Sequence, residues 1–306
     1  MNPAVSVILL TTLCGMGQGV FVMVLLGHLA GATPHFLILG TIASLLLCGA
    51  GLAASFFHLG RPERAWRAIA QCRTSWLSRE CIALPLFMAL VFAYGFLGLT
   101  GGRGATLIGT LALFACIALW ICTGMIYTCI RFIAEWASGY TLANFVLISL
   151  ATGATLALNL ALFSDLSMIR TFGYASLVFT TIAGLVRLGS LRRNARLVPE
   201  STLQSAIGIG HPVITQRSMG ATGGTFNTRE FFHGRTLDFL RSTRRLFLWF
   251  TFVLPPIAVL LALFGAAAAI AVPLALLLQT IGLMVERWFF FAQANHAQNL
   301  YYQVVS

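Results

Sequence analysis

The residues best suited to chemistry lie in a polar segment that separates two long apolar runs. His58 comes at the end of the first run, and Glu80 comes at the start of the next. An imidazole and a carboxylate can both accept a proton or a hydrogen bond, so the pair could serve a bound hydroxyl group. Five arginines lie between them: Arg61, Arg64, Arg67, Arg73 and Arg79. A titratable pair among fixed positive charges indicates a candidate site at a membrane surface.

Each member of the pair also has a purely structural interpretation. Glu80 could be a solvated charge at the start of a helix, where the helix dipole favours a carboxylate. His58 could be a polar residue that ends a helix. The two are interpreted as a site because antiparallel helices joined by this segment would hold them at a similar depth.

A second candidate pair, Glu286 and Arg287, lies inside the last apolar run. Charges at membrane depth are costly and usually face the interior of a helix bundle. The pair is interpreted first as a structural ion pair with another helix. Together with His296 in the polar run that follows, it could instead line a proton or quinone route. Weaker candidates are interpreted as polar contacts between helices or as a charged helix end: Asn144, Asn159 and Arg187.

No metal site is predicted. The seven cysteines form no CxxC pair, whereas zinc and Fe–S sites need clustered thiolates. Only His28, His58 and His296 lie in or at the ends of apolar runs, and His28 should face the opposite membrane surface from His58. The four-histidine pattern of a two-haem cytochrome b is therefore missing. A single haem b between His58 and His296 stays open as an alternative.

The elements that must position these residues are membrane helices. The chain is 58% hydrophobic and 9% charged, whereas soluble domains carry about a quarter charged residues. Apolar runs of about 20 residues match the thickness of a bilayer. The sequence predicts an all-α integral membrane protein, a bundle of eight transmembrane helices in a single membrane domain, 1–306. The predicted spans are 4–29, 36–57, 80–99, 105–130, 140–163, 170–190, 246–268 and one from Pro273 to about Tyr301.

The charge is unevenly distributed over the connecting segments. All 19 basic residues are arginine, and the net charge is +11. Residues 191–245 form a basic extramembrane loop between the sixth and seventh spans, and 62–71 resemble a short interfacial helix. The loops after the second, fourth and sixth spans, together with Arg187 near the end of the sixth span, carry sixteen of the nineteen arginines. By the positive-inside rule, both termini and the His58–Cys81 segment face the cytoplasm. The charge suits anionic lipid or an acidic protein partner, and no nucleic acid is expected.

The segment HLGRPERAW…SWLSRE resembles the membrane-anchor subunit of the bacterial dimethyl sulfoxide reductase family. That family has the pattern HLG-x-P-x-R-A, followed by a serine-rich approach to a glutamate that opens the third span. The matching residues here are His58, Leu59, Gly60, Pro62, Arg64, Ala65, Ser75, Leu77, Ser78 and Glu80. The motif is confined to about 25 residues, while the eight-span architecture agrees over the whole chain.

The resemblance implies a role in anaerobic respiration at the bacterial inner membrane. Such anchors contain no haem or Fe–S cluster and oxidise menaquinol or ubiquinol. They pass the electrons to a four-cluster Fe–S subunit, which feeds a molybdopterin catalytic subunit. By this analogy Glu80 accepts protons and His58 bonds the quinol oxygen. The other expected quinol-binding residues are Arg61, Arg64, Trp76 and Arg79, whose arginines could stabilise an anionic semiquinone or dock the Fe–S partner.

Two questions stay open at this stage. Relatives often work with molybdenum subunits exported by the twin-arginine route, which would place the partners on the other side from the cytoplasm. A secondary transporter that uses Glu80 and Glu286 as coupling sites is also compatible with the composition, although no internal repeat is evident. The sequence leaves the terminal substrate, the quinone and the direction of electron flow undetermined.

Overall fold

The computed structural model describes residues 1–100, 102, 104–199, 201–218, 226, 230–265 and 267–301, without the side chain of His58. Within this part of the chain, all regular secondary structure is helical. Eight helical segments are long and apolar enough to cross a membrane. The predicted all-α bundle of eight membrane helices is therefore confirmed.

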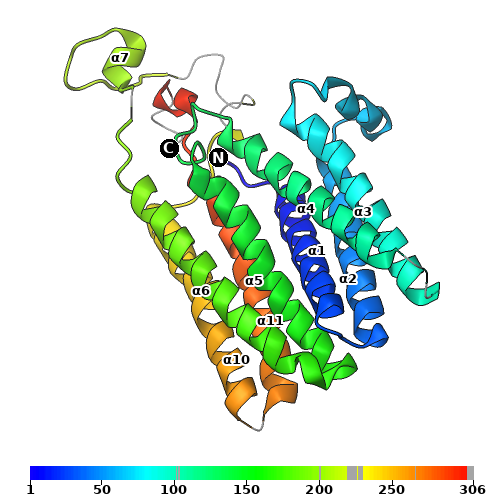
Figure 1. Ribbon diagram of the computed structural model, residues 1–306. Helices are drawn as coiled ribbons and strands as arrows, with labels where there is room; N and C mark the ends of the chain where they lie inside the picture. The colour runs from blue at the N-terminus through cyan, green and yellow to red at the C-terminus, as the bar shows by residue number, and fades with distance from the viewer. Residues whose placement is uncertain are drawn as a thin grey trace.

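The long helices follow one another in an up-and-down order (Figure 1). They are α1 Val5–Leu29, α2 Pro34–Ser55, α3 Trp76–Thr100, α4 Ala105–Thr128, α5 Gly139–Ser164, α6 Ile169–Asn194, α9 Leu237–Leu248, α10 Leu254–Phe264 and α11 Ala268–Ala292. A π-helical turn, η5 Trp249–Val253, joins α9 to α10 into one span. The short elements are η1 Phe56–His58, η2 Pro62–Gln71, η3 Leu166–Met168, α7 Leu203–Ile207 and η6 Ala297–Tyr301.

The two ends of the bundle differ in their connections. One end, here called the motif face, carries η1, η2, the segment 129–138, the described parts of 195–236, and the chain after α11 (Figure 1). The other end, the opposite face, carries the short turns that join α1 to α2, α3 to α4, α5 to α6 and α10 to α11. Because successive spans alternate in direction, His58 and Glu80 both fall at the motif face.

The helix α1 lies at the centre of the packing. It contacts α2, α4, α5 and α11, and most of its residues are buried. Its closest crossing is with α5, where Gly19 lies against Ser149 and Gly153. A Cβ atom built on Gly153 would lie 2.1 Å from the Gly19 carbonyl carbon and 2.4 Å from the Val20 nitrogen. Small residues let membrane helices approach this closely.

Replacing Gly153 by alanine is expected to separate α1 from α5, because the clashing atoms are backbone and cannot rotate away. Overpacking of this kind costs about 1–3 kcal/mol, so the purified protein should unfold at a lower temperature than the wild type. Gly139→Ala in the same helix is the control, since a Cβ there meets nothing within 4 Å. Equal unfolding temperatures for the two variants would contradict this account of the crossing.

At the opposite face, one carboxylate joins two turns. The Asp165 side chain accepts hydrogen bonds from the Thr33 backbone N–H at 2.6 Å and from the Ser167 hydroxyl at 2.6 Å. The Thr33 hydroxyl in turn donates to the Ser164 carbonyl at 3.1 Å. Hydrogen bonds from Ser167 and Thr33 lower the pKa of Asp165 below its usual value of 3.8. The ionised carboxylate therefore stabilises the contact between the α1–α2 and α5–α6 turns.

The Asp165 contact predicts a pH dependence of stability. A carboxyl whose folded-state pKa is depressed contributes stability above its unfolded pKa and loses it as the pH falls through the folded value. Asp165→Asn should therefore lower the unfolding temperature at pH 7, and the difference from wild type should shrink as the pH falls below 3.8. Thermal unfolding of both proteins across this range measures the effect, and a difference that is constant with pH would argue against it.

Several predicted boundaries need correction. The third span begins at Trp76, four residues before Glu80, because the Ser75 hydroxyl accepts a hydrogen bond from the Ser78 N–H and caps the helix. Glu80 thus lies in the second turn and not at the helix start. Helices α6 and α9 also extend into both ends of the predicted 191–245 loop.

The prediction of one helix from Pro273 to about Tyr301 is wrong at both ends. Helix α11 begins at Ala268 and accommodates Pro273, as membrane helices can. It ends at Ala292, and a 3-10 turn follows only from Ala297. In between, the Asn295 backbone N–H and side-chain amide donate to the Glu135 carboxylate at 3.4 and 3.0 Å. These contacts hold the chain in a non-helical course at the motif face.

Candidate functional site

The Glu80 carboxylate is held by a neighbouring helix at the motif face. The Thr123 hydroxyl, on α4, donates a short hydrogen bond to it. Both residues are partly buried, and α3 and α4 pack against each other along their length. The bond fixes one carboxylate oxygen and leaves the second as an acceptor. Nothing in the sequence pointed to Thr123, because a threonine within an apolar span is ordinary.

Arg79 and Trp76 form a separate contact that holds the preceding loop. The Arg79 guanidinium donates to the carbonyl oxygens of Cys72 at 2.9 Å and Arg73 at 2.7 Å. It also lies 4.2 Å from the centre of the Trp76 ring. Consecutive residues on a helix point to different sides, which separates Arg79 from Glu80. Arg79 and Trp76, which belong to the predicted quinol-binding set, therefore hold this loop in its shape.

Of the remaining predicted arginines, Arg64 lies on η2 and Arg61 immediately precedes it. Arg61 and Arg64 are exposed, and the Arg64 side chain lies 4.0 Å from the Glu63 carboxylate. Among the contacts that the structure describes, none joins either arginine to Glu80. Trp66 is 68% exposed on the same short helix. This surface offers positive charge and an aromatic ring to a lipid head group or a protein partner.

His58 ends η1, the 3-10 turn that continues α2 at the motif face. Its backbone lies at the same end of the bundle as Glu80. Its side chain lies outside the described part of the structure, so its predicted contact with a ligand or with Glu80 stays a prediction.

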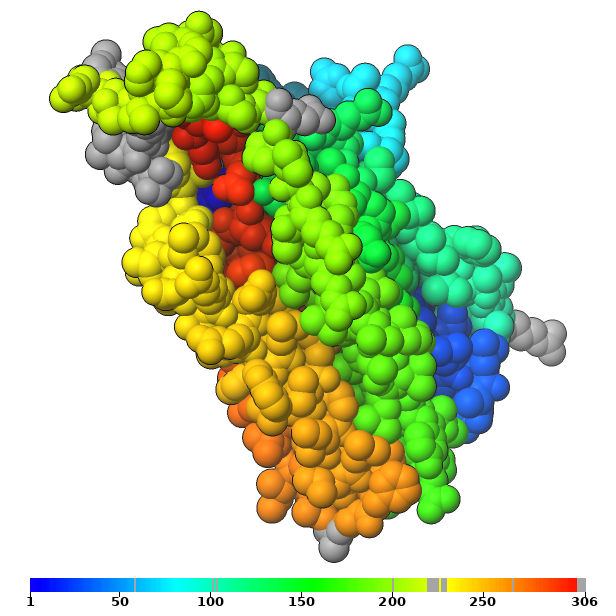
Figure 2. All heavy atoms as spheres, turned by 90° about the vertical axis from the view of Figure 1, so that its left-hand side faces the viewer, coloured from blue at the N-terminus to red at the C-terminus, as the bar shows by residue number. Residues whose placement is uncertain are grey.

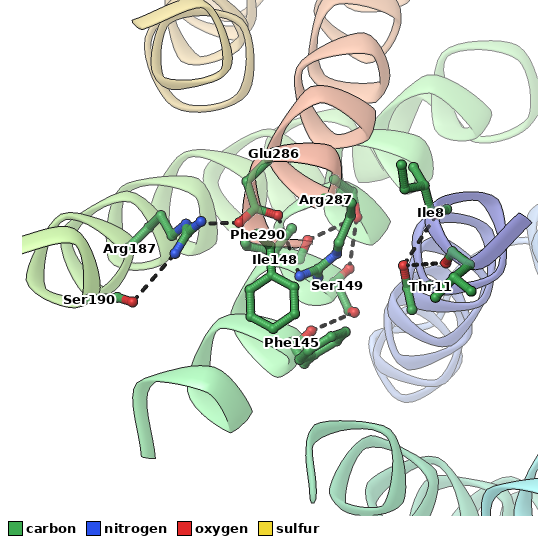
Figure 3. Close-up of polar contacts among 12 residues, drawn as sticks. Ile8, Thr11, Phe145, Ile148, Ser149, Arg187, Ser190, Glu286, Arg287 and Phe290 are labelled. Atoms are coloured by element: carbon green, nitrogen blue, oxygen red, sulfur yellow. Dashed lines mark hydrogen bonds and ion pairs between the residues drawn. The ribbon is translucent and has the colours of Figure 1, made fainter. Parts of the chain in front are cut away.

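The second candidate pair belongs to a buried group of three charges, here called the charge triad: Arg187, Glu286 and Arg287 (Figure 3). Arg187 Nε lies 2.8 Å from one Glu286 oxygen, and Arg287 Nη1 lies 3.4 Å from the other. The three side chains are 2%, 1% and 2% exposed. Arg187 comes from α6, whereas the other two come from α11. The triad thus connects two helices that are far apart in the sequence.

Aromatic rings cover both guanidinium groups of the charge triad. Arg287 lies 4.1 Å from the centre of the Phe145 ring, and Arg187 lies 5.5 Å from that of Phe247. Such contacts partly replace the lost hydration of a cation. With two arginines and one glutamate, the triad has a formal charge of +1. Asn144, beside Phe145 on α5, is also buried, and neither of its amide atoms has a partner among the described residues.

His296 lies apart from the charge triad, beyond the end of α11. Its ring stacks on Phe231 with centroids 3.8 Å apart, and its Nδ1 accepts from the Gln298 N–H at 3.2 Å. Phe232 from the same long connection is also buried. Part of this connection therefore packs on its own chain, and Phe226 is the one of its three described phenylalanines that is strongly exposed. In Figure 2 the C-terminal segment is visible between α9 and α6.

Within the described residues, no group of three or more histidine, cysteine, aspartate or glutamate side chains is placed to hold a metal ion. The free cysteines are distributed over several helices, and Cys72 and Cys129 are exposed. The Glu80 carboxylate, with its hydrogen-bond partner Thr123 at the motif face, is therefore the candidate site.

Comparison with known proteins identifies similar chains. The profile of the family described as "DMSO reductase anchor subunit (DmsC)" matches residues 1–292. The chain is 44% identical to a sulfite dehydrogenase subunit of Allochromatium vinosum, over 100% of both chains. It is 34% identical to the anaerobic dimethyl sulfoxide reductase chain YnfH of Escherichia coli, over 37% of this chain and 40% of that protein.

Proposed function

The chain belongs to the DMSO reductase anchor subunit family and is a multi-pass membrane subunit of an oxidoreductase complex, and from this premise we propose that it exchanges electrons with a membrane quinone at the Glu80 site. The observation that carries the proposal is the Glu80 carboxylate held by Thr123 at the motif face. Conversion between a quinone and a quinol moves two electrons and two protons. A positioned carboxylate supplies the proton acceptor or donor that this reaction needs.

Each residue near the site has a proposed part in this exchange. Glu80 transfers the proton to or from the quinone oxygen, and Thr123 holds its carboxylate in one orientation. His58 bonds the ring oxygen, as the family resemblance implies. Arg79 and Trp76 act indirectly, because their contact fixes the loop that leads into α3.

The direction of electron flow follows from the partner enzyme. The relative that aligns with the whole chain is part of a sulfite dehydrogenase, which is named for an oxidation. We therefore favour electrons that enter this chain's complex from an inorganic sulfur donor such as sulfite and reduce the quinone. Quinol oxidation by the same site, as in a reductase complex, is the second candidate, and the partial match to a dimethyl sulfoxide reductase chain supports it.

The direction can be measured on the purified complex. With sulfite as the donor and a short-chain quinone as the acceptor, we expect quinone reduction coupled to sulfate formation. A complex that instead oxidises a quinol with dimethyl sulfoxide, and does not react with sulfite, would establish the second candidate. Activity in neither assay, from a complex whose partners are present and active with artificial dyes, would contradict the quinone site.

The proposed partners are an Fe–S subunit and a molybdopterin catalytic subunit, which dock at the motif face. The exposed arginines of η2 and the exposed ring of Phe226 offer charge and an apolar anchor for such a docking surface. This chain itself is proposed to hold neither haem nor an Fe–S cluster. Mass spectrometry of proteins retained in mild detergent tests the partners, and a haem absorption band in the isolated chain would contradict the cofactor assignment.

The motif face is proposed to lie in the cytoplasm of a bacterial cell, on the arginine distribution. Cys72, which follows η2 at the motif face, provides the test, because it is an exposed cysteine that the chain already contains. In intact cells an impermeant maleimide should leave Cys72 unlabelled, and it should label Cys72 after the membrane is opened. Cys72→Ser and Cys129→Ser variants identify the labelled residue, and labelling of Cys72 in intact cells would reverse the orientation.

A further inference from the structure

A second polar pair lies at the opposite face, within the helices α1 and α3. His28 Nδ1 lies 2.7 Å from the Tyr94 hydroxyl oxygen. Tyr94 is only 2% exposed, whereas His28 is partly exposed. This pair is at the far end of the bundle from Glu80, and the quinone chemistry proposed above does not use it.

The pair forms part of the wall of a cavity of about 260 Å³. The cavity lies among the ends of α1, α2, α3 and α4, and most of its other lining residues are apolar, among them Pro34, Leu37, Ile38, Gly98 and Ala105. Pro34 and Gly98 are exposed, so the cavity is open to the surface of the bundle. The Thr41 hydroxyl donates its proton to the Leu37 carbonyl at 2.7 Å, so this proton is not free to bond a ligand.

The pair, which lines the cavity, keeps one free hydrogen-bond donor in either arrangement of its protons. A tyrosine and a neutral histidine carry two donors between them, and their mutual bond uses one. If Tyr94 donates to Nδ1, the proton on His28 Nε2 is left over. If His28 Nδ1 donates, the tyrosine hydroxyl proton is left over. A ligand oxygen that accepts a single hydrogen bond therefore matches this site.

We propose that this cavity binds the head group of a quinone, as a second site at the membrane face opposite to Glu80. The volume suits one substituted ring, and the apolar lining suits its methyl groups and the start of an isoprenoid tail. A carbonyl oxygen on a mostly apolar ring fits the single free donor of the pair and the mostly apolar lining of the cavity. The proposal rests on the proposed function only in that both sites bind a quinone. At this second site the quinone binds without electron transfer.

A photoreactive short-chain azidoquinone tests the site on the purified complex. Mass spectrometry of the labelled peptides should place the label within residues 34–41 or 94–105, and the label should saturate with concentration. His28→Leu and Tyr94→Phe each leave one donor, so each should raise the half-saturating concentration by less than about threefold. The double variant removes both donors, so the increase should reach about tenfold.

Two further variants keep the test decisive. Gly98→Phe should block labelling while the His28–Tyr94 pair stays intact, since a Cβ at Gly98 meets nothing within 4 Å and the helix should tolerate the change. Tyr174→Phe is the matched control, because Tyr174 is 51% exposed and lies outside the cavity. Labelling elsewhere only, labelling unaffected by Gly98→Phe and the double variant, or a phospholipid retained in the cavity would each overturn the proposal.

The outcome can be separated from that for the Glu80 site. Glu80→Gln should leave labelling of the cavity peptides unchanged, because the two sites lie at opposite faces. If the cavity is labelled but Glu80→Gln has no effect on turnover, the second site stands and the proposed function fails. If turnover depends on Glu80 but the cavity is not labelled, the reverse holds.

Discussion

Glu80→Gln is expected to lower quinone-linked turnover of the complex about a hundredfold, because the amide keeps the shape of the side chain but cannot carry the proton. The hydrogen bond from the Thr123 hydroxyl can still form to the amide oxygen, so the helix contact should survive. The chain should remain in the membrane with its partners bound. Steady-state assays with a quinone and with an artificial dye separate the two effects, since only the quinone reaction should slow.

Glu63→Gln is the matched control for Glu80. Glu63 lies on η2 at the same face of the bundle, but its carboxylate is 66% exposed and lies 4.0 Å from the Arg64 side chain. Its removal should change turnover by less than about twofold, the scale of a screened surface charge. If Glu80→Gln keeps more than half of the wild-type turnover, Glu80 is not the proton-transfer residue.

Glu286→Gln is expected to destabilise the folded protein strongly. The change leaves two buried arginines without their shared carboxylate, and breaking a buried ion pair in this way costs about 3–5 kcal/mol. The contact between α6 and α11 should weaken, since the charge triad connects these helices. Thermal or denaturant unfolding in detergent, together with the yield of the intact complex, measures the loss.

Asp238 and Arg241 form a control ion pair. Their charged atoms are as close as those of Arg187 and Glu286, at 2.8 Å, but their side chains are 88% and 67% exposed. Asp238→Asn should cost less than about 1 kcal/mol, because water already solvates both charges. Equal losses for Glu286→Gln and Asp238→Asn would show that burial of the charge triad does not contribute to stability.

The charge triad also bears on the sequence-based alternatives for Glu286. The geometry shows an ion-pair network between α6 and α11, with each Glu286 oxygen facing a guanidinium group. This arrangement favours the structural interpretation, in which Glu286 and Arg287 form an ion-pair network with another helix.

Much of the architecture could be predicted from the sequence because the bilayer restricts the choices. A membrane core requires apolar helices of about 20 residues with their backbone bonds satisfied internally, so eight apolar runs became eight spans. Alternation of direction then placed His58 and Glu80 at one face and His28 at the other. Either Ser75 or Ser78 suited a helix cap by its residue type, and the structure shows that Ser75 caps α3.

The contacts that define the sites were decided by the tertiary structure. Membrane helices here are apolar on all sides, so hydrophobic periodicity does not tell which face of a helix meets which neighbour. The pairing of Glu80 with Thr123, and of Glu286 with Arg187, depends on the rotation and order of helices in the bundle. The same applies to the cavity beside His28 and Tyr94, which four helix ends form together. The number of spans and the face on which each polar residue lies follow from the apolar runs and their order along the chain, whereas side-chain packing between helices selects the partners of that residue.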